Sequence, residues 1–182
     1  WLQRKAVGLC GPIASGKTTA ARHLENLGFN YKRFSQTLSA LLKDKGISQS
    51  RKNLQEFGNQ VNQEKGQRWL ASRMLDDLSD NNNVVIDGIR FPEDIAFMKE
   101  YFGPGFISVF VSAPYESRKH RYVQLGYTSN DFEQAAHHYV ERKVSDLKIL
   151  SNYNIENSDG LQIFQNKITK LIQQTSTVCL YQ

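Results

Sequence analysis

The chain has few cysteines and no long hydrophobic run, and these absences exclude several classes of protein. Cys10 and Cys179 lie far apart and form no CxxC motif or Cys/His cluster, which argues against a disulfide framework and a structural zinc site. We therefore expect a reduced, cytoplasmic protein. The longest strongly apolar stretch, residues 106–111, has the length of a strand. A membrane-spanning helix needs about 20 apolar residues, so we expect no membrane segment.

The excess of basic over acidic residues is also small. There are 23 Lys and Arg residues against 18 Asp and Glu, which gives a formal net charge of +5. This balance suits phosphate-bearing ligands, although a generic basic surface explains it equally well. The excess is too small and too dispersed to indicate nucleic-acid binding. The chain starts without Met or an apolar leader and has an apolar ending, residues 178–181. Both features favour a fused or partner domain beyond the ends.

Apolar runs of strand length alternate with amphipathic helical segments along the 182 residues, a length that fits one domain. This alternation predicts right-handed crossovers and a parallel sheet with helices on both faces. The fold class is therefore α/β, with three layers: a central five-stranded parallel sheet and a layer of helices on each of its faces. The expected strands are 6–10, 29–34, 84–88, 106–111 and 153–156. The main expected helices are 17–27, 38–45, 50–78, 92–101, 114–125, 131–147 and 161–172.

Two residues are candidate helix N-caps. Ser35 precedes the expected helix at 38–45, and a serine side chain can accept a hydrogen bond from a first-turn amide. Thr128, with Asp131 three residues later, resembles a capping box for the helix expected at 131–147.

The segment Gly11–Thr18 reads GPIASGKT and matches the pattern GxxxxGK[ST] in full. Its glycines allow a tight turn in which backbone N–H groups converge on phosphate oxygens at a helix N-terminus. Lys17 is expected to reach the β and γ phosphates, and the Thr18 hydroxyl to bind Mg²⁺. An ordinary glycine turn is the alternative, but a strand before and a helix after favour nucleotide binding. ATP and Mg²⁺ are thus the expected cofactors, and the expected nucleotide-binding residues are Gly11, Ala14, Ser15, Gly16, Lys17, Thr18 and Thr19.

Asp87 ends the apolar run that begins at Val84. A carboxylate at the end of a neighbouring parallel strand can hold a magnesium-bound water opposite Thr18. Alternatively, Asp87 caps the turn that follows it. The phosphate loop nearby favours the metal role.

Together these segments resemble the nucleoside monophosphate kinase group of P-loop proteins. Asp87–Arg90 is similar to the Asp-Gly-Phe-Pro-Arg stretch of adenylate kinases, with one residue fewer. Asp87–Glu93 is closer to the DxRFPxE stretch of phage-type deoxynucleoside monophosphate kinases, and Arg51–Gly58 matches their RxxLQxxG element. Ile155–Asn157 resembles the end of dephospho-CoA kinases and of small archaeal proteins related to both. The resemblance covers about residues 5–172.

The resemblance implies a single P-loop kinase domain over residues 1–182, with a helical NMP-binding insertion and a helical lid. The implied core is 5–46, 82–113 and 151–174, the insertion about 47–81, and the lid about 114–148.

The resemblance also implies ATP-dependent transfer of a phosphoryl group to the phosphate of a nucleoside or deoxynucleoside monophosphate. Arg90 and Arg51 would grip the acceptor phosphate from two sides, because guanidinium groups bind phosphate oxygens in pairs. Gln55 and Asn59 could read a base edge. Alternatively, Arg90 forms a surface salt bridge and Arg51 is a solvated residue at a helix start. Gln55 and Asn59 could equally belong to a simple polar helix face. The implied acceptor-binding residues are Ser35, Arg51, Gln55 and Arg90.

In this kinase group the lid arginines close on the transferring phosphates, where fixed cations stabilise the developing charge. Arg118 and Arg121 share one helical face. Each could instead be a solvated charge, and His137 and His138 are interpreted as ordinary surface residues. The implied catalytic residues are Lys17, Asp87, Arg90, Arg118, Arg121 and Arg142.

One position bears on the acceptor. Dephospho-CoA kinases, which phosphorylate a hydroxyl, carry an aspartate base just after the second strand. Here that place reads Arg33–Gln36, with no acid. A phosphate acceptor is already anionic at neutral pH and needs no base, so the missing aspartate favours a phosphate acceptor. A dephospho-CoA kinase-like enzyme and a nucleotide-sensing module of a larger protein stay open as alternatives.

Overall fold

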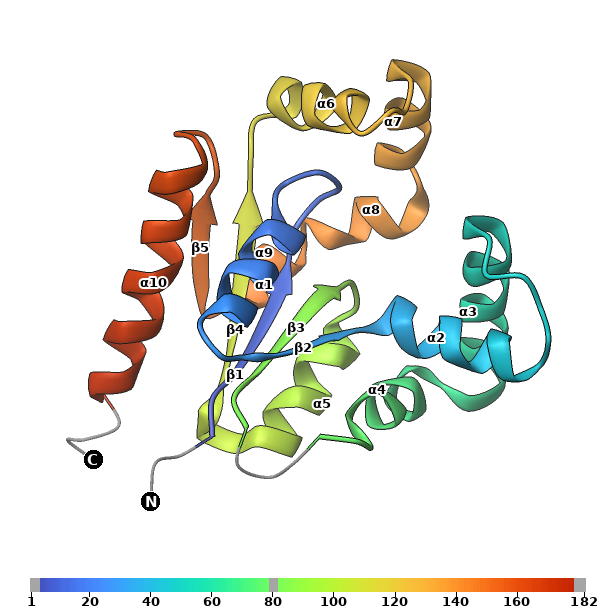
Figure 1. Ribbon diagram of the computed structural model, residues 1–182, viewed down its shortest axis with the longest axis horizontal. Coiled ribbons are helices and arrows are strands. Elements are labelled where there is room, and N and C mark those ends of the chain that lie inside the picture. Colours follow the sequence, from blue (N-terminus) through green and yellow to red (C-terminus); the bar gives the residue numbers. More distant parts are fainter. Residues whose placement is uncertain (1–3, 79–81, 179–182) are drawn as a thin grey trace.

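The computed structural model describes residues 4–78 and 82–178, except the side chains of residues 51, 139, 140, 142 and 176–178. In this part of the chain, one five-stranded parallel sheet is flanked by helices on both faces (Figure 1), so the predicted fold class is confirmed. The strands are β1 (Ala6–Cys10), β2 (Asn30–Arg33), β3 (Val84–Ile89), β4 (Phe106–Ser112) and β5 (Tyr153–Glu156). The helices are α1 (Lys17–Asn26), α2 (Phe34–Asp44), α3 (Arg51–Lys65), α4 (Gln67–Leu75), α5 (Pro92–Phe102), α6 (Tyr115–Gln124), α7 (Ser129–Ala136), α8 (Tyr139–Val144), α9 (Leu147–Leu150) and α10 (Leu161–Val178), with a 3-10 turn, η1, at Gly103–Gly105.

The strands are arranged in the order β2-β3-β1-β4-β5, and every neighbouring pair is parallel. β1 lies at the centre, and all five of its residues are buried. Continuous apolar runs such as β1 are typical of parallel strands that are covered on both faces. The carboxyl ends of parallel strands meet at one edge of the sheet. The loops after β1, β2 and β3 therefore meet there.

Two apolar clusters hold the helices on the two faces. On one face, Leu24 of α1 and Phe164 of α10 pack on β-strand side chains such as Val85. On the other, Met74 of α4 and Met98 of α5 lie in a separate cluster. Fully burying a side chain of this size contributes about 1.5–3 kcal/mol. Both faces are thereby closed, and the carboxyl edge is left for a ligand.

Helices α2, α3 and α4 form a smaller cluster of their own beside the sheet, at the right of Figure 1. Leu38, Val61 and Leu70 are its buried members. Gly66, with a φ of +84°, separates α3 from α4, because a backbone in the left-handed region cannot continue a helix. The helix predicted at 50–78 is therefore two helices, α3 and α4.

The prediction for Ser35 is wrong. Helix α2 begins at Phe34, directly after β2, and its N-cap is Arg33 in an extended conformation. Ser35 is therefore the second residue of the helix rather than its cap. The first turn of α2 starts earlier than the local sequence indicates because Phe34 packs against two of the apolar clusters.

The predicted helix at 131–147 is also wrong, although the capping box of Thr128 and Asp131 is present. The chain forms α7, α8 and α9 instead. Phe132 packs beneath α6 against two tyrosine rings, whereas Val144 and Leu147 pack in the cluster beside the sheet. One straight helix could not serve both places.

None of the described helices combines the length and the apolarity that crossing a membrane requires. The last helix, α10, continues past the predicted end at Ile172 to Val178. Residues 179–181 of the apolar ending lie outside the described residues.

Candidate active site

The loop between β1 and α1 follows a tight path. Gly11 has a φ of +136°, Ala14 of +58° and Gly16 of +111°. A side chain at Gly11 would place its Cβ 2.1 Å from the carbonyl oxygen of Val111, so only glycine fits there. Successive residues of such a loop direct their N–H groups into a shared concavity at the start of α1. The geometry suits the phosphate groups of a nucleotide.

Asn157 supports this loop from the end of β5. Its Nδ2 donates a hydrogen bond to the carbonyl oxygen of Ser15 at 2.9 Å, and its own N–H donates to the carbonyl oxygen of Ser112 at 2.8 Å. A Cβ at Gly16 would lie 2.3 Å from Asn157 Nδ2, so this contact requires glycine. Sequence reasoning placed Asn157 only in a resemblance and gave it no role. Its one signal was an amide side chain directly after a strand.

The hydroxyl of Ser15 is buried within the loop and has no hydrogen-bond partner among the residues that the structure describes. A buried hydroxyl without a partner costs free energy, and a bound ligand is one way to satisfy it. This observation fits a phosphate-bearing ligand in the loop.

Lys17 folds back over the same loop. Its Nζ donates hydrogen bonds to the carbonyl oxygens of Gly11 and Pro12, both at 2.8 Å. Burial of the ammonium group lowers the pKa of Lys17 to about 8, and the nearby Glu141 carboxylate opposes that shift. The lysine is thus held beside the loop, and these two carbonyl oxygens only partly compensate for the burial of its ammonium group.

Thr18 and Asp87 lie together at the start of α1. Thr18 Oγ1 donates to Asp87 Oδ2 at 2.8 Å, and the Tyr31 hydroxyl donates to the same oxygen at 2.9 Å. The Asp87 side chain is only 1% exposed, and Arg33 Nε lies 3.9 Å from it. Burial and the neighbouring Asp87 carboxylate raise the pKa of Tyr31 to about 12. Asp87 Oδ2 thus accepts hydrogen bonds from a side chain of α1 and a side chain of β2.

Thr18 and Asp87 supply two hard oxygen donors side by side. Mg²⁺ characteristically keeps several waters and binds one or two protein oxygens together with substrate phosphates. The residues present therefore fit this ion. Among the described residues, no group of three or more His, Cys, Asp and Glu side chains is placed to hold a metal.

Arg90 follows β3 at the same edge of the sheet, and its side chain is half-exposed. Its Nη1 lies 3.9 Å from Glu141 Oε1, while Glu141 Oε2 accepts a hydrogen bond from the N–H of Ile13 at 2.8 Å. No sequence pattern pointed to Glu141. A single acidic residue in a helical pattern carries no signal, and only the break between α7 and α8 brings it to the loop.

The structure brings Arg118 and Arg121 of α6 to the loop. Arg118 Nη1 donates to the carbonyl oxygen of Ile13 at 3.2 Å. Arg121 Nη2 donates to the carbonyl oxygen of Asn157 at 2.8 Å, and its Nη1 is within 3.5 Å of the carbonyl oxygen of Ala14. Both guanidinium groups are engaged with backbone carbonyls in this arrangement.

Three other residues predicted for the site lie in helices, namely Thr19 in α1, Ser35 in α2 and Gln55 in α3. Thr19 is an exposed residue in the first turn of α1, and Ser35 is half-buried in α2. Gln55 of α3 is hydrogen-bonded to His138, with 3.1 Å between their Nε2 atoms, so α3 contacts the segment between α7 and α8. The side chains of Arg51 and Arg142 lie outside the described part of the chain.

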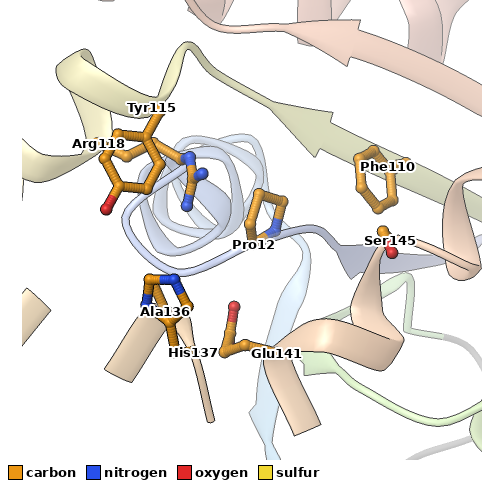
Figure 2. Close-up of a pocket in the computed structure, with 8 residues that line it drawn as sticks. All are labelled: Pro12, Phe110, Tyr115, Arg118, Ala136, His137, Glu141 and Ser145. Atoms are coloured by element: carbon orange, nitrogen blue, oxygen red, sulfur yellow. The ribbon is translucent and has the colours of Figure 1, made fainter. Parts of the chain in front are cut away.

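A cavity of about 260 Å³ adjoins the loop on the side of α6 to α8. Figure 2 shows its lining, with Tyr115 and Arg118 on one side and Phe110 and Ser145 on another. Glu141 enters from below in this view, its carboxylate directed towards the loop near Pro12. His137, which the sequence analysis interprets as a surface residue, is exposed and also lines the cavity.

The family model AAA_18, described as an AAA domain, matches residues 7–149, which include the loop, Asp87 and Glu141. The chain belongs to the AAA_18 family. The matched region runs from β1 to α9. Among the described strands and helices, β5 and α10 lie outside it.

A UPF0200 protein of Methanosarcina barkeri is 25% identical over 176 residues, which cover 92% of this chain and 94% of that protein. Among solved structures, TT1252 from Thermus thermophilus has a TM-score of 0.62 at 18% identity, covering 94% of this chain and 98% of that one. Dephospho-CoA kinase from Campylobacter jejuni also has a TM-score of 0.62, at 15% identity, covering 96% and 98%. These likenesses establish a P-loop kinase fold.

Proposed function

We propose that this protein transfers the γ-phosphoryl group of ATP to the phosphate of a nucleoside or deoxynucleoside monophosphate. One observation carries the proposal: the carboxyl ends of β1 and β3 bring Lys17, Thr18, Asp87 and Arg90 to a single edge of the sheet. Binding a nucleotide needs the loop and Lys17. Transfer needs in addition a metal site and a cation for the acceptor, which Thr18 with Asp87 and Arg90 would supply.

The loop amides and Lys17 would hold the β and γ phosphates. For this, Lys17 Nζ exchanges the carbonyl oxygens of Gly11 and Pro12 for phosphate oxygens. Mg²⁺, held by Thr18 and Asp87, would neutralise charge that develops on the transferring group. Arg90 would bind the acceptor phosphate and align its oxygen with the γ-phosphorus.

The end of β2 supports a phosphate acceptor. Arg33 stands there, exposed and 3.9 Å from Asp87, near the place where the resemblance puts the aspartate base of dephospho-CoA kinases. A cation at this position favours an anionic acceptor and cannot take a proton. In this proposal Arg33, beside Asp87, and Arg90, at the end of the same strand, would both face the acceptor phosphate.

In the same proposal, α3 and α4 belong to the NMP-binding insertion, about residues 47–81. Helices α6 to α8 belong to a lid, about residues 114–148. The hydrogen bond between Gln55 and His138 joins these two segments and supports an acceptor site between them. Arg118 and Arg121 would turn from backbone carbonyls to phosphate oxygens when the lid closes.

A second candidate is a kinase that phosphorylates a hydroxyl group, the alternative that the resemblance to dephospho-CoA kinases leaves open, and one structural neighbour is a dephospho-CoA kinase. One observation favours it: the buried carboxylate of Glu141 lies beside the loop and could serve as the base that the end of β2 lacks.

A coupled assay with ATP and Mg²⁺ tests these functions across the common NMPs, dNMPs and dephospho-CoA. We expect turnover with at least one monophosphate and none with dephospho-CoA. The variant Lys17→Ala should bind nucleotide weakly and lose turnover while keeping its circular dichroism spectrum. Undiminished activity in that variant would falsify the proposal. ATP binding without turnover on any acceptor would instead favour a nucleotide-sensing module.

A further inference from the structure

Glu141 makes a contact that the proposed transfer does not use. Its Oε2 accepts the N–H of Ile13, an amide inside the phosphate loop, at 2.8 Å. Its Oε1 lies 3.9 Å from Arg90 Nη1, and only 7% of its side chain is exposed. A buried carboxylate needs such partners, because an isolated buried charge is costly. Glu141 therefore occupies a place that is built for an anion.

The cations around this carboxylate are the ones assigned to phosphate groups. The Glu141 charge is the largest influence that opposes the lowering of the Lys17 pKa by burial. It also acts in the same sense on the pKa of Arg118, which burial lowers. Lys17 and Arg118 thus lie within the electrostatic influence of Glu141, and Arg90 lies 3.9 Å from it. One internal carboxylate offsets part of the charge of these three cations when no nucleotide is bound.

The position of Arg90 indicates which end of the loop Glu141 fills. In-line transfer requires the terminal phosphate of ATP to face the acceptor, which Arg90 binds. This step rests on the proposed function. Since Glu141 bridges Ile13 and Arg90, its carboxylate lies at the end where the terminal phosphate would be placed. In Figure 2 the carboxylate is directed towards the loop from α8.

We propose that Glu141 is an internal substitute for the terminal phosphate of ATP. A nucleoside triphosphate must displace its carboxylate from the Ile13 amide, whereas a diphosphate leaves that contact in place. Glu141 is thus a specificity-determining residue that sets the preference of the site between triphosphate and diphosphate. Because Glu141 belongs to α8, its displacement also releases this helix from the loop.

Isothermal titration calorimetry with ADP and a non-hydrolysable ATP analogue, both with Mg²⁺ and without acceptor, tests this proposal. In Glu141→Gln, the analogue should bind about tenfold more tightly than in the wild type, while the Kd for ADP changes less than about twofold. Glu141→Asp keeps the charge but shortens the side chain by one methylene group. It should also bind the analogue more tightly, because its carboxylate no longer reaches Ile13.

Glu133→Gln is the matched control. Glu133 lies on α7, is partly exposed and pairs with Lys119 at 2.8 Å, so its neutralisation removes a nearby charge without touching the loop. Both Kd values should stay at the wild-type level. In the wild-type chain, hydrogen exchange in α8 should rise with the analogue and stay unchanged with ADP.

Equal tightening of both nucleotides in Glu141→Gln, with no change in Glu141→Asp, would overturn the proposal in favour of a general charge effect. Unchanged or weaker analogue binding would also overturn it. If weaker binding came with lost turnover on a hydroxyl acceptor, Glu141 would be the base of the second candidate function. A failure of the proposed function is a separate result, namely no turnover of any monophosphate by the wild type, and it leaves the ratio of Kd values measurable.

Discussion

Thr18 Oγ1 donates a hydrogen bond to Asp87 Oδ2 at 2.8 Å, which joins the first turn of α1 to the end of β3. These side chains are 69 residues apart in the sequence. In parallel pairing, Leu9 of β1 stands opposite Asp87 of β3, so the loop after β1 and the carboxylate reach the same edge. The proposed metal site therefore follows directly from strand order.

Asp87→Asn should lower kcat about 100-fold, because an amide keeps the shape of the side chain but removes the charge that the metal needs. The Mg²⁺ concentration for half-maximal activity should rise as well. A Mg²⁺ titration of kcat checks this expectation. Asp77→Asn is the control, since Asp77 is exposed and pairs with Lys32 at the surface. Wild-type Mg²⁺ dependence in Asp87→Asn would remove Asp87 from the metal site.

The affinity for ATP should fall as pH rises through about 8. In the free protein, burial lowers the pKa of Lys17 to about 8, so the lysine loses its proton above that pH. The bound phosphates favour the protonated form, and binding above pH 8 must therefore take up a proton. The Kd should rise by up to about tenfold per pH unit there. Titration calorimetry between pH 7 and 9.5 measures the dependence, and Lys17→Met should abolish it.

Arg90→Ala should raise the KM of the acceptor and also lower kcat, with the apparent KM of ATP nearly unchanged. The reason is that a guanidinium that grips the acceptor phosphate counts most where charge develops in the transition state. Steady-state kinetics with each substrate varied separately distinguish the two effects. Arg68→Ala, which removes an exposed arginine paired with Glu100, should leave all constants unchanged. If Arg90→Ala behaves like that control, Arg90 does not bind the acceptor.

Asn157→Ala should weaken nucleotide binding about tenfold and lower the free energy of unfolding by about 1–2 kcal/mol. It removes the hydrogen bond to the carbonyl oxygen of Ser15 and leaves that buried acceptor without this partner. Calorimetry and urea unfolding measure the two effects. Asn166→Ala, at an exposed position of α10, provides the comparison. Loss of stability without loss of affinity would give Asn157 a purely structural role.

Asp94 should make the protein less stable as pH rises from about 4 to 6. Burial raises the pKa of its carboxyl group to about 6, although Gln67 and the N–H groups of Arg90 and Phe91 stabilise the charged form. Between the unfolded and folded pKa values the native state holds more protons, so stability falls across that window by about 3 kcal/mol. Urea unfolding at a series of pH values measures this fall. In Asp94→Asn it should be much smaller.

Local sequence patterns were sufficient for the phosphate loop and the class of fold. The glycines of the loop are required because Gly11 and Gly16 have positive φ values and leave no room for a Cβ. Apolar runs of strand length such as β1 predict a covered parallel sheet, and that sheet is present. Each of these features depends on residues that are close together in the sequence, so a local sequence pattern is enough to predict it.

The missed or misplaced features depend on contacts between distant residues. Ser35 has the right chemistry for a cap, but the packing of Phe34 moves the start of α2. The helix predicted at 131–147 breaks because Phe132 and Leu147 belong to different apolar clusters.

The amino-acid sequence alone determined the phosphate loop, the alternation of strands and helices that makes an α/β fold, and the presence of an acid near the end of β3. Only the tertiary structure decided that the Asn157 side chain donates to the carbonyl oxygen of Ser15 and that Glu141 accepts the N–H of Ile13. Local conformation depends on neighbouring residues along the chain, so a periodic pattern of apolar residues can predict it. A contact across 128 residues, such as that between Ile13 and Glu141, forms only when several elements pack together, and no local pattern encodes it.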